Sequence, residues 1–172
     1  MRWLRTIIYV VVALIIVVIA TGWYLLAGSK AQRDGTINVA ALSAPVTITR
    51  DHIGVVTIDA ANRRDLAWAT GFVHAQERFF QMDLQRRLAA GELAALLGPV
   101  ALKADLNHRR HRFRERAEHY VQQLPPRQHR LFDAYRDGVN AGLEHLRVRP
   151  WEYLLLGTKP EPWRDADTLL TL

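Results

Sequence analysis

The sequence has 172 residues, a formal net charge of +6 and no cysteine. This length allows about one ordinary domain, and the lack of cysteine excludes both a disulfide framework and a thiolate site. The positive surplus is modest, so the composition does not by itself indicate a nucleic-acid partner.

The first predicted element is an apolar helix that is long enough to cross a membrane. Residues 6–29 contain no charge, whereas a bilayer core needs about 20 apolar residues and a cleavable signal peptide has roughly 7–15. Arg2 and Arg5 precede the segment, and basic residues tend to stay in the cytoplasm. We therefore predict an inner-membrane anchor over residues 1–29, with the remainder facing the periplasm. A signal peptide cleaved near Gly28 is the alternative, and either way the chain is exported.

A linker and a hairpin are predicted next. Residues 30–44 are mostly small and polar, which is typical of a linker. Residues 45–50 then alternate between apolar and polar types, and residues 55–58 are all β-branched. Gly54 in the intervening turn can adopt a positive φ without steric cost. Two strands joined by a glycine-containing loop indicate a β-hairpin.

The period becomes helical after Asn62, a good N-cap residue. Apolar residues then recur at helical spacing and predict one buried stripe, made of Leu66, Ala69, Val73, Phe80, Leu84 and Leu88. Further helices are predicted over 92–97, 105–123 and 127–147, followed by a short apolar segment over 151–156 and a helix start at Asp165. The predicted fold class is therefore α+β and mostly helical.

The last residues begin an apolar turn that has no cap, which leaves backbone carbonyls and side chains without partners. We therefore expect the sequence to be a fragment of a longer protein. Some of its large apolar side chains are expected to pack against later sequence, the candidates being Phe72, Phe79, Phe80, Trp151 and Trp163.

Two sets of charged residues are candidates for binding chemistry. His74 and Glu77 lie one helical turn apart, but two ligands do not make a metal site. Ion pairs along the helix, such as Asp83 with Arg87 at i,i+4, are the favoured interpretation. The basic run at residues 108–116 has no nucleic-acid motif. It is interpreted as a solvated or partner-facing helix surface, with contact to anionic lipid left open.

No nucleophile is apparent in the sequence. Its serines are Ser29 and Ser43, and neither lies in a nucleophile elbow or a lysine-paired motif. We therefore predict no catalytic residue and no metal ligand, and leave the substrate-binding residues unknown. From these residues alone, the chain is predicted to be a membrane-tethered helical binding module without catalysis.

Several ordered motifs change this interpretation. They occur at residues 46–55, 65–76, 86–94 and 134–141, and at Pro160-Glu161-Pro162-Trp163. In this order they resemble the α-chain portion of the penicillin acylase family of N-terminal-nucleophile hydrolases. Glu77 and Val56 are mild departures, since the family more often has Asp and Pro there. The resemblance places residues 45–172 in an incomplete acylase-like domain of αββα fold.

The resemblance implies a precursor that cleaves itself into α and β chains, in which the new terminal serine of the β chain attacks an amide. The nucleophile, the oxyanion donors and the usual calcium ligands would then lie beyond Leu172. This segment would hold no cofactor, although the complete protein could bind calcium. Its partners would be the downstream α region, the β chain, the membrane and a small N-acyl amide, with no nucleic acid. The fragment alone is predicted to be inactive as an amidase.

Overall fold

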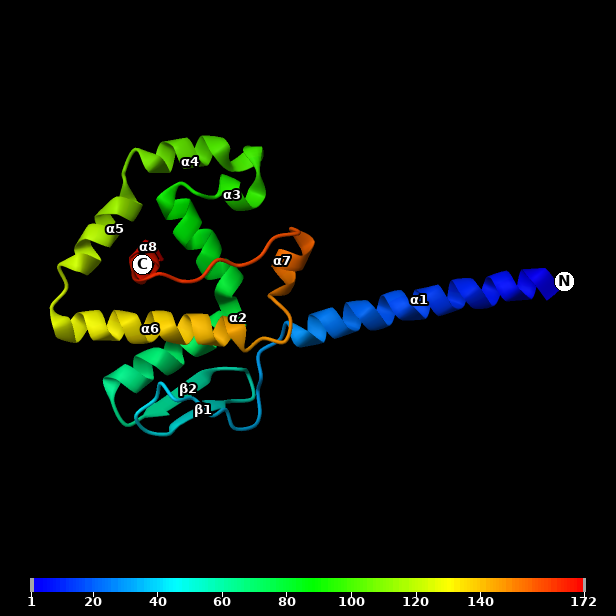
Figure 1. The fold of residues 1–172 in the computed structure, drawn as a ribbon, viewed down its shortest axis with the longest axis horizontal. Helices are drawn as coiled ribbons and strands as arrows, with labels where there is room; N and C mark the ends of the chain where they lie inside the picture. Colours follow the sequence, from blue (N-terminus) through cyan, green and yellow to red (C-terminus); the bar gives the residue numbers. More distant parts are fainter. Residues whose placement is uncertain (1, 172) are drawn as a thin grey trace.

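The computed structural model describes residues 2–171, which form a long projecting helix and a mostly helical body with one hairpin (Figure 1). The helices are α1 (Arg2–Gly28), α2 (Arg63–Ala90), α3 (Ala94–Leu97), α4 (Leu102–Arg109), α5 (Phe113–Gln122), α6 (Pro126–Glu144), α7 (Trp151–Leu155) and α8 (Asp165–Leu170), with a 3-10 turn at Pro99–Ala101 and strands β1 (Val46–Arg50) and β2 (Val56–Ala60). The predicted hairpin and the predicted predominance of helix are confirmed.

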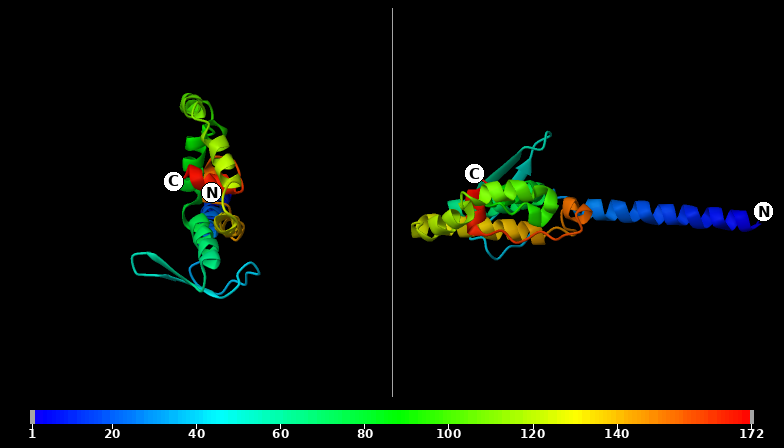
Figure 2. Two further views of the ribbon diagram at one scale, coloured as in Figure 1. Left: turned by 90° about the vertical axis from the view of Figure 1, so that its left-hand side faces the viewer. Right: turned by 90° about the horizontal axis from the view of Figure 1, so that it is seen from above.

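Helix α1 extends away from the body in Figure 1 and in the right-hand view of Figure 2. It is long and apolar enough to cross a membrane, a property that it shares with signal sequences. Its last turn is bonded to the loop between α6 and α7. The backbone N–H of Val148 donates to the carbonyl of Gly28 at 3.0 Å, and the Ser29 hydroxyl donates to the carbonyl of Arg149 at 3.1 Å.

The hairpin pairs β1 with β2 in antiparallel register, with Ile48 opposite Ile58. Its turn is closed by Asp51, whose Oδ1 accepts from the backbone N–H of Ile53 at 3.0 Å and of Val55 at 2.8 Å. Gly54 has φ 89°, the positive value that the sequence predicted. Because a two-stranded sheet is marginally stable alone, its packing on α2 through Ile58 and other apolar residues is needed to hold it.

Helix α2 is the centre of the body, and α6, α8 and the hairpin all pack against it. The predicted apolar stripe is wrong at its ends, because Leu66 and Leu88 are 40% and 41% exposed. The face that is buried has the same helical period but includes charged and polar side chains. Its members are Asp65, Trp68, Ala69, Gly71, Phe72, Val73, Ala75, Gln76, Phe79, Met82, Asp83, Arg86, Arg87 and Ala90.

Helices α2 and α6 pack with their backbones in direct contact. A Cβ added at Gly138 would lie 1.9 Å from the carbonyl oxygen of Trp68, and one at Gly71 would lie 2.2 Å from that of Tyr135. Only glycine therefore permits this crossing. The glycine motif at residues 138–141 is thus explained by packing, and Val139 beside it is fully buried.

The single helix predicted over 105–123 is two helices in the structure. The chain turns at Arg110–Arg112, and Arg112 has φ 53°, a left-handed conformation that ends the helical path. Asp105 in α4 accepts from the backbone N–H groups of Leu93 and Ala94, at 2.8 and 2.7 Å. The break lets α4 pack against α2 while α5 turns toward α8.

The core of the body is closed by residues from its last segment. Trp163 is 1% exposed and Tyr153 is fully buried, and both pack with Phe79 of α2. Phe72, Phe79 and Trp163 are covered by this chain itself. Packing against later sequence stays a prediction for the other two candidates, Phe80 and Trp151. Trp151 is 47% exposed and does not share in that core.

Candidate functional site

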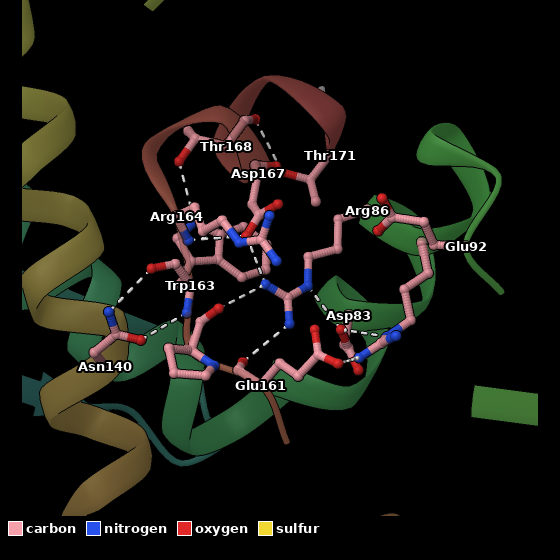
Figure 3. Close-up of polar contacts among 12 residues, drawn as sticks. Asp83, Arg86, Glu92, Asn140, Glu161, Trp163, Arg164, Asp167, Thr168 and Thr171 are labelled. Carbon is pink, nitrogen blue, oxygen red and sulfur yellow. Dashed lines mark hydrogen bonds and ion pairs between the residues drawn. The ribbon is translucent and has the colours of Figure 1, made fainter. Parts of the chain in front are cut away.

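A group of charged residues joins α2, α5 and α8, and Figure 3 shows part of it. We call it the ion cluster, and it consists of Asp83, Arg86, Arg87, Glu92, Arg114 and Asp167. The side chains of Asp83 and Asp167 are fully buried, and that of Arg86 is 3% exposed. Such charges are retained inside a protein only where they are paired and hydrogen-bonded.

Arg86 makes the most contacts in the cluster. Its guanidinium donates to Asp83 Oδ1 at 2.7 Å and to Asp167 Oδ2 at 2.5 Å. It also donates to the carbonyls of Glu161 and Pro162, both at 3.0 Å. Its planar face lies 4.9 Å from the ring of Trp163, within the range of a cation–π contact. One side chain thus binds α8 and the preceding turn to α2.

Asp83 is the shared acceptor on α2. Its Oδ1 also accepts from Arg87 Nε at 2.9 Å. Its Oδ2 accepts from the Tyr153 hydroxyl of α7 at 2.5 Å. Burial raises the pKa of the Tyr153 phenol, and the neighbouring Asp83 carboxylate raises it further. Tyr153 therefore stays protonated and acts as a donor.

Arg114 of α5 completes the cluster. It binds Glu92 through two bonds of 2.8 and 2.7 Å and Asp167 Oδ1 at 2.6 Å. Burial lowers the pKa of Arg114, but hydrogen bonds to Glu92 and Asp167 outweigh burial and raise it. Asp167 Oδ2 also accepts from the backbone N–H of Arg164 at 2.8 Å, which caps α8.

Trp163 is fixed at every polar atom (Figure 3). Asn140 of α6 accepts from its backbone N–H at 2.7 Å and donates to its carbonyl at 3.0 Å. The indole N–H donates to Thr168 Oγ1 at 3.1 Å. The Pro-Glu-Pro-Trp motif is thereby locked between α2, α6 and α8. The cluster has the chemistry of a structural clamp, since each of its carboxylates is already neutralised by an arginine.

The predicted ion pair between Asp83 and Arg87 of α2 is confirmed. His74 and Glu77 contact different residues and do not form a shared site. His74 Nδ1 lies 3.0 Å from the Tyr135 hydroxyl, and burial lowers the pKa of this imidazole. Glu77 instead accepts from Arg50 of β1 at 3.0 and 2.7 Å. This second pair ties the hairpin to α2.

One group of possible metal ligands was not anticipated. Among residues 2–171, His129, Asp133 and Asp165 bring ligand atoms within 4.8 Å of one another. Arg136 already donates to Asp133 at 2.9 Å and to Asp165 at 2.8 Å, so its guanidinium supplies the positive charge. Calcium prefers six to eight oxygen ligands, which this group does not offer. We assign no metal to it.

The serines have structural partners. Ser43 donates its hydroxyl and its backbone N–H to Asp65, and the hydroxyl bond is 2.6 Å long. This hydroxyl lowers the pKa of Asp65 most, and burial opposes the effect. Asp65 also accepts from Asn62, the N-cap of α2. The group fixes the segment before the hairpin onto the start of α2.

The basic run at residues 108–116 lies on α4, α5 and the turn between them. In Figure 1 this turn is at the edge of the body away from the exit of α1. Two arginines of the run make hydrogen bonds within the body: Arg109 donates to the carbonyl of Gly91 at 2.7 Å, and Arg114 donates to Glu92 and Asp167. The run is thus partly structural.

The order of motifs and the fold define the class of this protein. The penicillin amidase family model matches residues 45–172, and the chain belongs to this family. The solved thermostable penicillin G acylase of Alcaligenes faecalis has a similar structure. The TM-score is 0.66 and the identity 32%, and the match covers 74% of this chain and 69% of that one.

Curated relatives narrow the class. Penicillin acylase 2 proenzyme of Pseudomonas sp. (strain SE83) is 42% identical over 139 residues, which is 81% of this chain and 18% of that protein. The acyl-homoserine lactone acylase QuiP of Pseudomonas aeruginosa is 35% identical over 145 residues, which is 84% of this chain and 17% of that protein. The chain thus spans less than a fifth of the length of these relatives.

Proposed function

We propose that this chain is the N-terminal α-chain part of a periplasmic amidohydrolase that cleaves N-acyl amide bonds. Family membership carries this proposal. The relatives act on different molecules by name, a penicillin in one case and an acyl-homoserine lactone in the other. Both compounds carry an acyl group on nitrogen, so the proposed substrate class is N-acyl compounds.

The coverage of the relatives supports an α-chain assignment. The matched region is 18% of the penicillin acylase 2 proenzyme but 69% of the solved acylase chain. This relation is expected if a precursor is cut into chains and the matched region lies in one of them.

The role proposed for residues 45–172 is to frame the active site rather than to supply its nucleophile. The carboxylates of the ion cluster are held in arginine pairs, and Ser43 is bonded to Asp65. What the cluster does is set the position of α8. The polypeptide that follows would therefore leave the body in a fixed direction, where a second chain supplies the serine and the oxyanion donors.

The test compares this chain with the complete reading frame. Each is purified and assayed with a chromogenic N-acyl anilide and with an N-acyl-homoserine lactone. The complete protein should separate into two chains and release acid from at least one substrate, while residues 1–172 should match a heat-killed control. Turnover by residues 1–172 alone, or an intact and inactive complete protein, would overturn the proposal.

A further inference from the structure

Helix α1 is hydrogen-bonded to the body at the point where it leaves it. Val148 and Arg149 bond to Gly28 and Ser29, as described above. A Cβ at Gly28 would lie only 2.6 Å from Cγ2 of Val148, so the two segments touch. Gln32 just beyond contacts His145 at 3.2 Å. The direction of α1 therefore fixes the orientation of the whole body.

Exposed apolar side chains gather around this junction. Helix α7 lies at the base of α1 in Figure 1 and in the right-hand view of Figure 2. Trp151 and Leu155 are four residues apart, hence on one face of α7, and are 47% and 77% exposed. The hairpin turn adds Ile53, which is 73% exposed. A groove at the base of α1 is lined by Trp23, Trp151 and Ile53 together.

The composition of α1 near this point matches a membrane–water interface. Trp23 and Tyr24 are 73% and 65% exposed in its last turns, and such aromatic residues favour the headgroup level. Lys30 and Arg33 follow, both are exposed, and both line the same groove. Basic side chains at this depth attract anionic lipid headgroups. If α1 crosses the bilayer, the membrane surface lies at the level of Trp23, Tyr24, Lys30 and Arg33, where the helix joins the body.

We infer that α7 and the hairpin turn rest on the lipid surface, so that Trp151, Leu155 and Ile53 enter the headgroup region. With α1 they give three points of contact, which hold the body at one tilt to the membrane. The occupant of this apolar surface is phospholipid. This inference concerns the surface around α1 and does not depend on the proposed amidase activity.

The lack of cysteine makes the test direct, because single cysteines can be introduced into the full chain without further changes. We would label Leu155→Cys, Ile53→Cys and Tyr120→Cys with an environment-sensitive fluorophore and reconstitute each into phosphatidylglycerol-containing vesicles. Tyr120 is the matched control, since it is 55% exposed but lies on α5, away from α1. Ala13→Cys within α1 reports insertion.

Brominated lipids should quench the labels at 155 and 53 about twofold or more, because an interfacial apolar face lies within reach of acyl chains. The label at 120 should keep its aqueous emission.

If the label at 13 is quenched but those at 155 and 53 are not, α1 is inserted and the inferred contact is wrong. Labels at 155 and 53 that are shielded from aqueous iodide yet insensitive to brominated lipid would show a protein occupant and also overturn it. An unquenched label at 13 would refute both insertion and contact, with the amidase proposal unaffected.

Discussion

Among single residues, the charged side chains inside the body are the most costly to bury, and they depend most on their partners. Asp83 has no exposed surface, yet it accepts bonds from two arginines and a tyrosine. A buried charge of this kind is destabilising as soon as a partner is removed, because the remaining charge has no water around it. Exposed ion pairs in the same chain are solvated and contribute much less.

The substitution Asp83→Asn should therefore destabilise the chain by about 3–5 kcal/mol, since Arg86 and Arg87 lose their shared counter-charge. The matched control is Glu115→Gln, which breaks the exposed pair with Arg112 and should change stability by about 0–1 kcal/mol. Urea unfolding of the detergent-solubilised chain measures both. Equal losses for the two variants would contradict the role given to the cluster.

Gly138 offers a second residue test. Gly138→Ala places a methyl group within 1.9 Å of the Trp68 carbonyl oxygen, so α6 must move off α2. Overpacking of this kind typically destabilises by about 1–3 kcal/mol or more. Gly22→Ala is the control, because a Cβ there meets nothing within 4 Å. Thermal melting should separate the two variants, and a Gly138→Ala melt equal to that of the control would argue against the close crossing.

His74 gives the chain a pH dependence with a defined sign. Its folded-state pKa lies below the ordinary value of about 6.5 because it is half-buried. Between these two pKa values the unfolded chain binds more protons, so stability is full above pH ~6.5 and is lost as the pH falls toward the folded pKa. The variant His74→Gln should not show this loss of stability at low pH, because glutamine does not titrate. The difference in melting temperature between wild type and variant should shrink from pH 7.5 to pH 5, and a constant difference would refute the assignment.

At the scale of elements, α2 shows what the sequence could and could not predict. Asn62 and Gly91 bound it as expected, but its helical path is kinked at Arg78 (φ −146°, ψ 22°), which the sequence did not predict. The buried face was missed because the prediction took apolar residues to be inside and charged ones outside. The true face includes Asp83, Arg86 and Arg87, whose burial depends on partners up to 81 residues away. A local pattern carries no information about such partners.

The hairpin is the opposite case, because its determinants are local. Asp51 and Gly54 are both in the turn, and the strands on each side alternate as the burial does. The sequence therefore sufficed to place it to within two residues. The sequence did not predict the helix break at Arg112, because that break, like the buried face of α2, depends on residues far away in the sequence. It serves the bonds of Arg114 to Glu92 and Asp167, which lie 22 and 53 residues away.

For the whole molecule, the proposed orientation follows from Arg2, Arg5 and the uncharged segment after them. A phosphatase reporter that is active only in the periplasm, fused after Leu172, should be active, because basic residues keep the N-terminus in the cytoplasm. The same fusion without residues 2–28 should be inactive. A well-expressed but inactive full fusion would count against the topology.

The separation between the members of the ion cluster also sets an order of events while the chain is being made. Residues emerge from the ribosome in sequence, so α2 is present long before Arg114 or Asp167 can reach it. During that interval Arg86 and Arg87 share the single carboxylate of Asp83, and we expect the unbalanced positive charge to keep the inner face of α2 hydrated. We therefore expect the nascent chain to pass through an open state, in which the hairpin and the start of α2 are assembled and Phe79 is uncovered. Trp163 and α8 cover Phe79 only when they arrive, so we expect the open state before their arrival to be the stage at which the chain most needs protection from proteases and from aggregation.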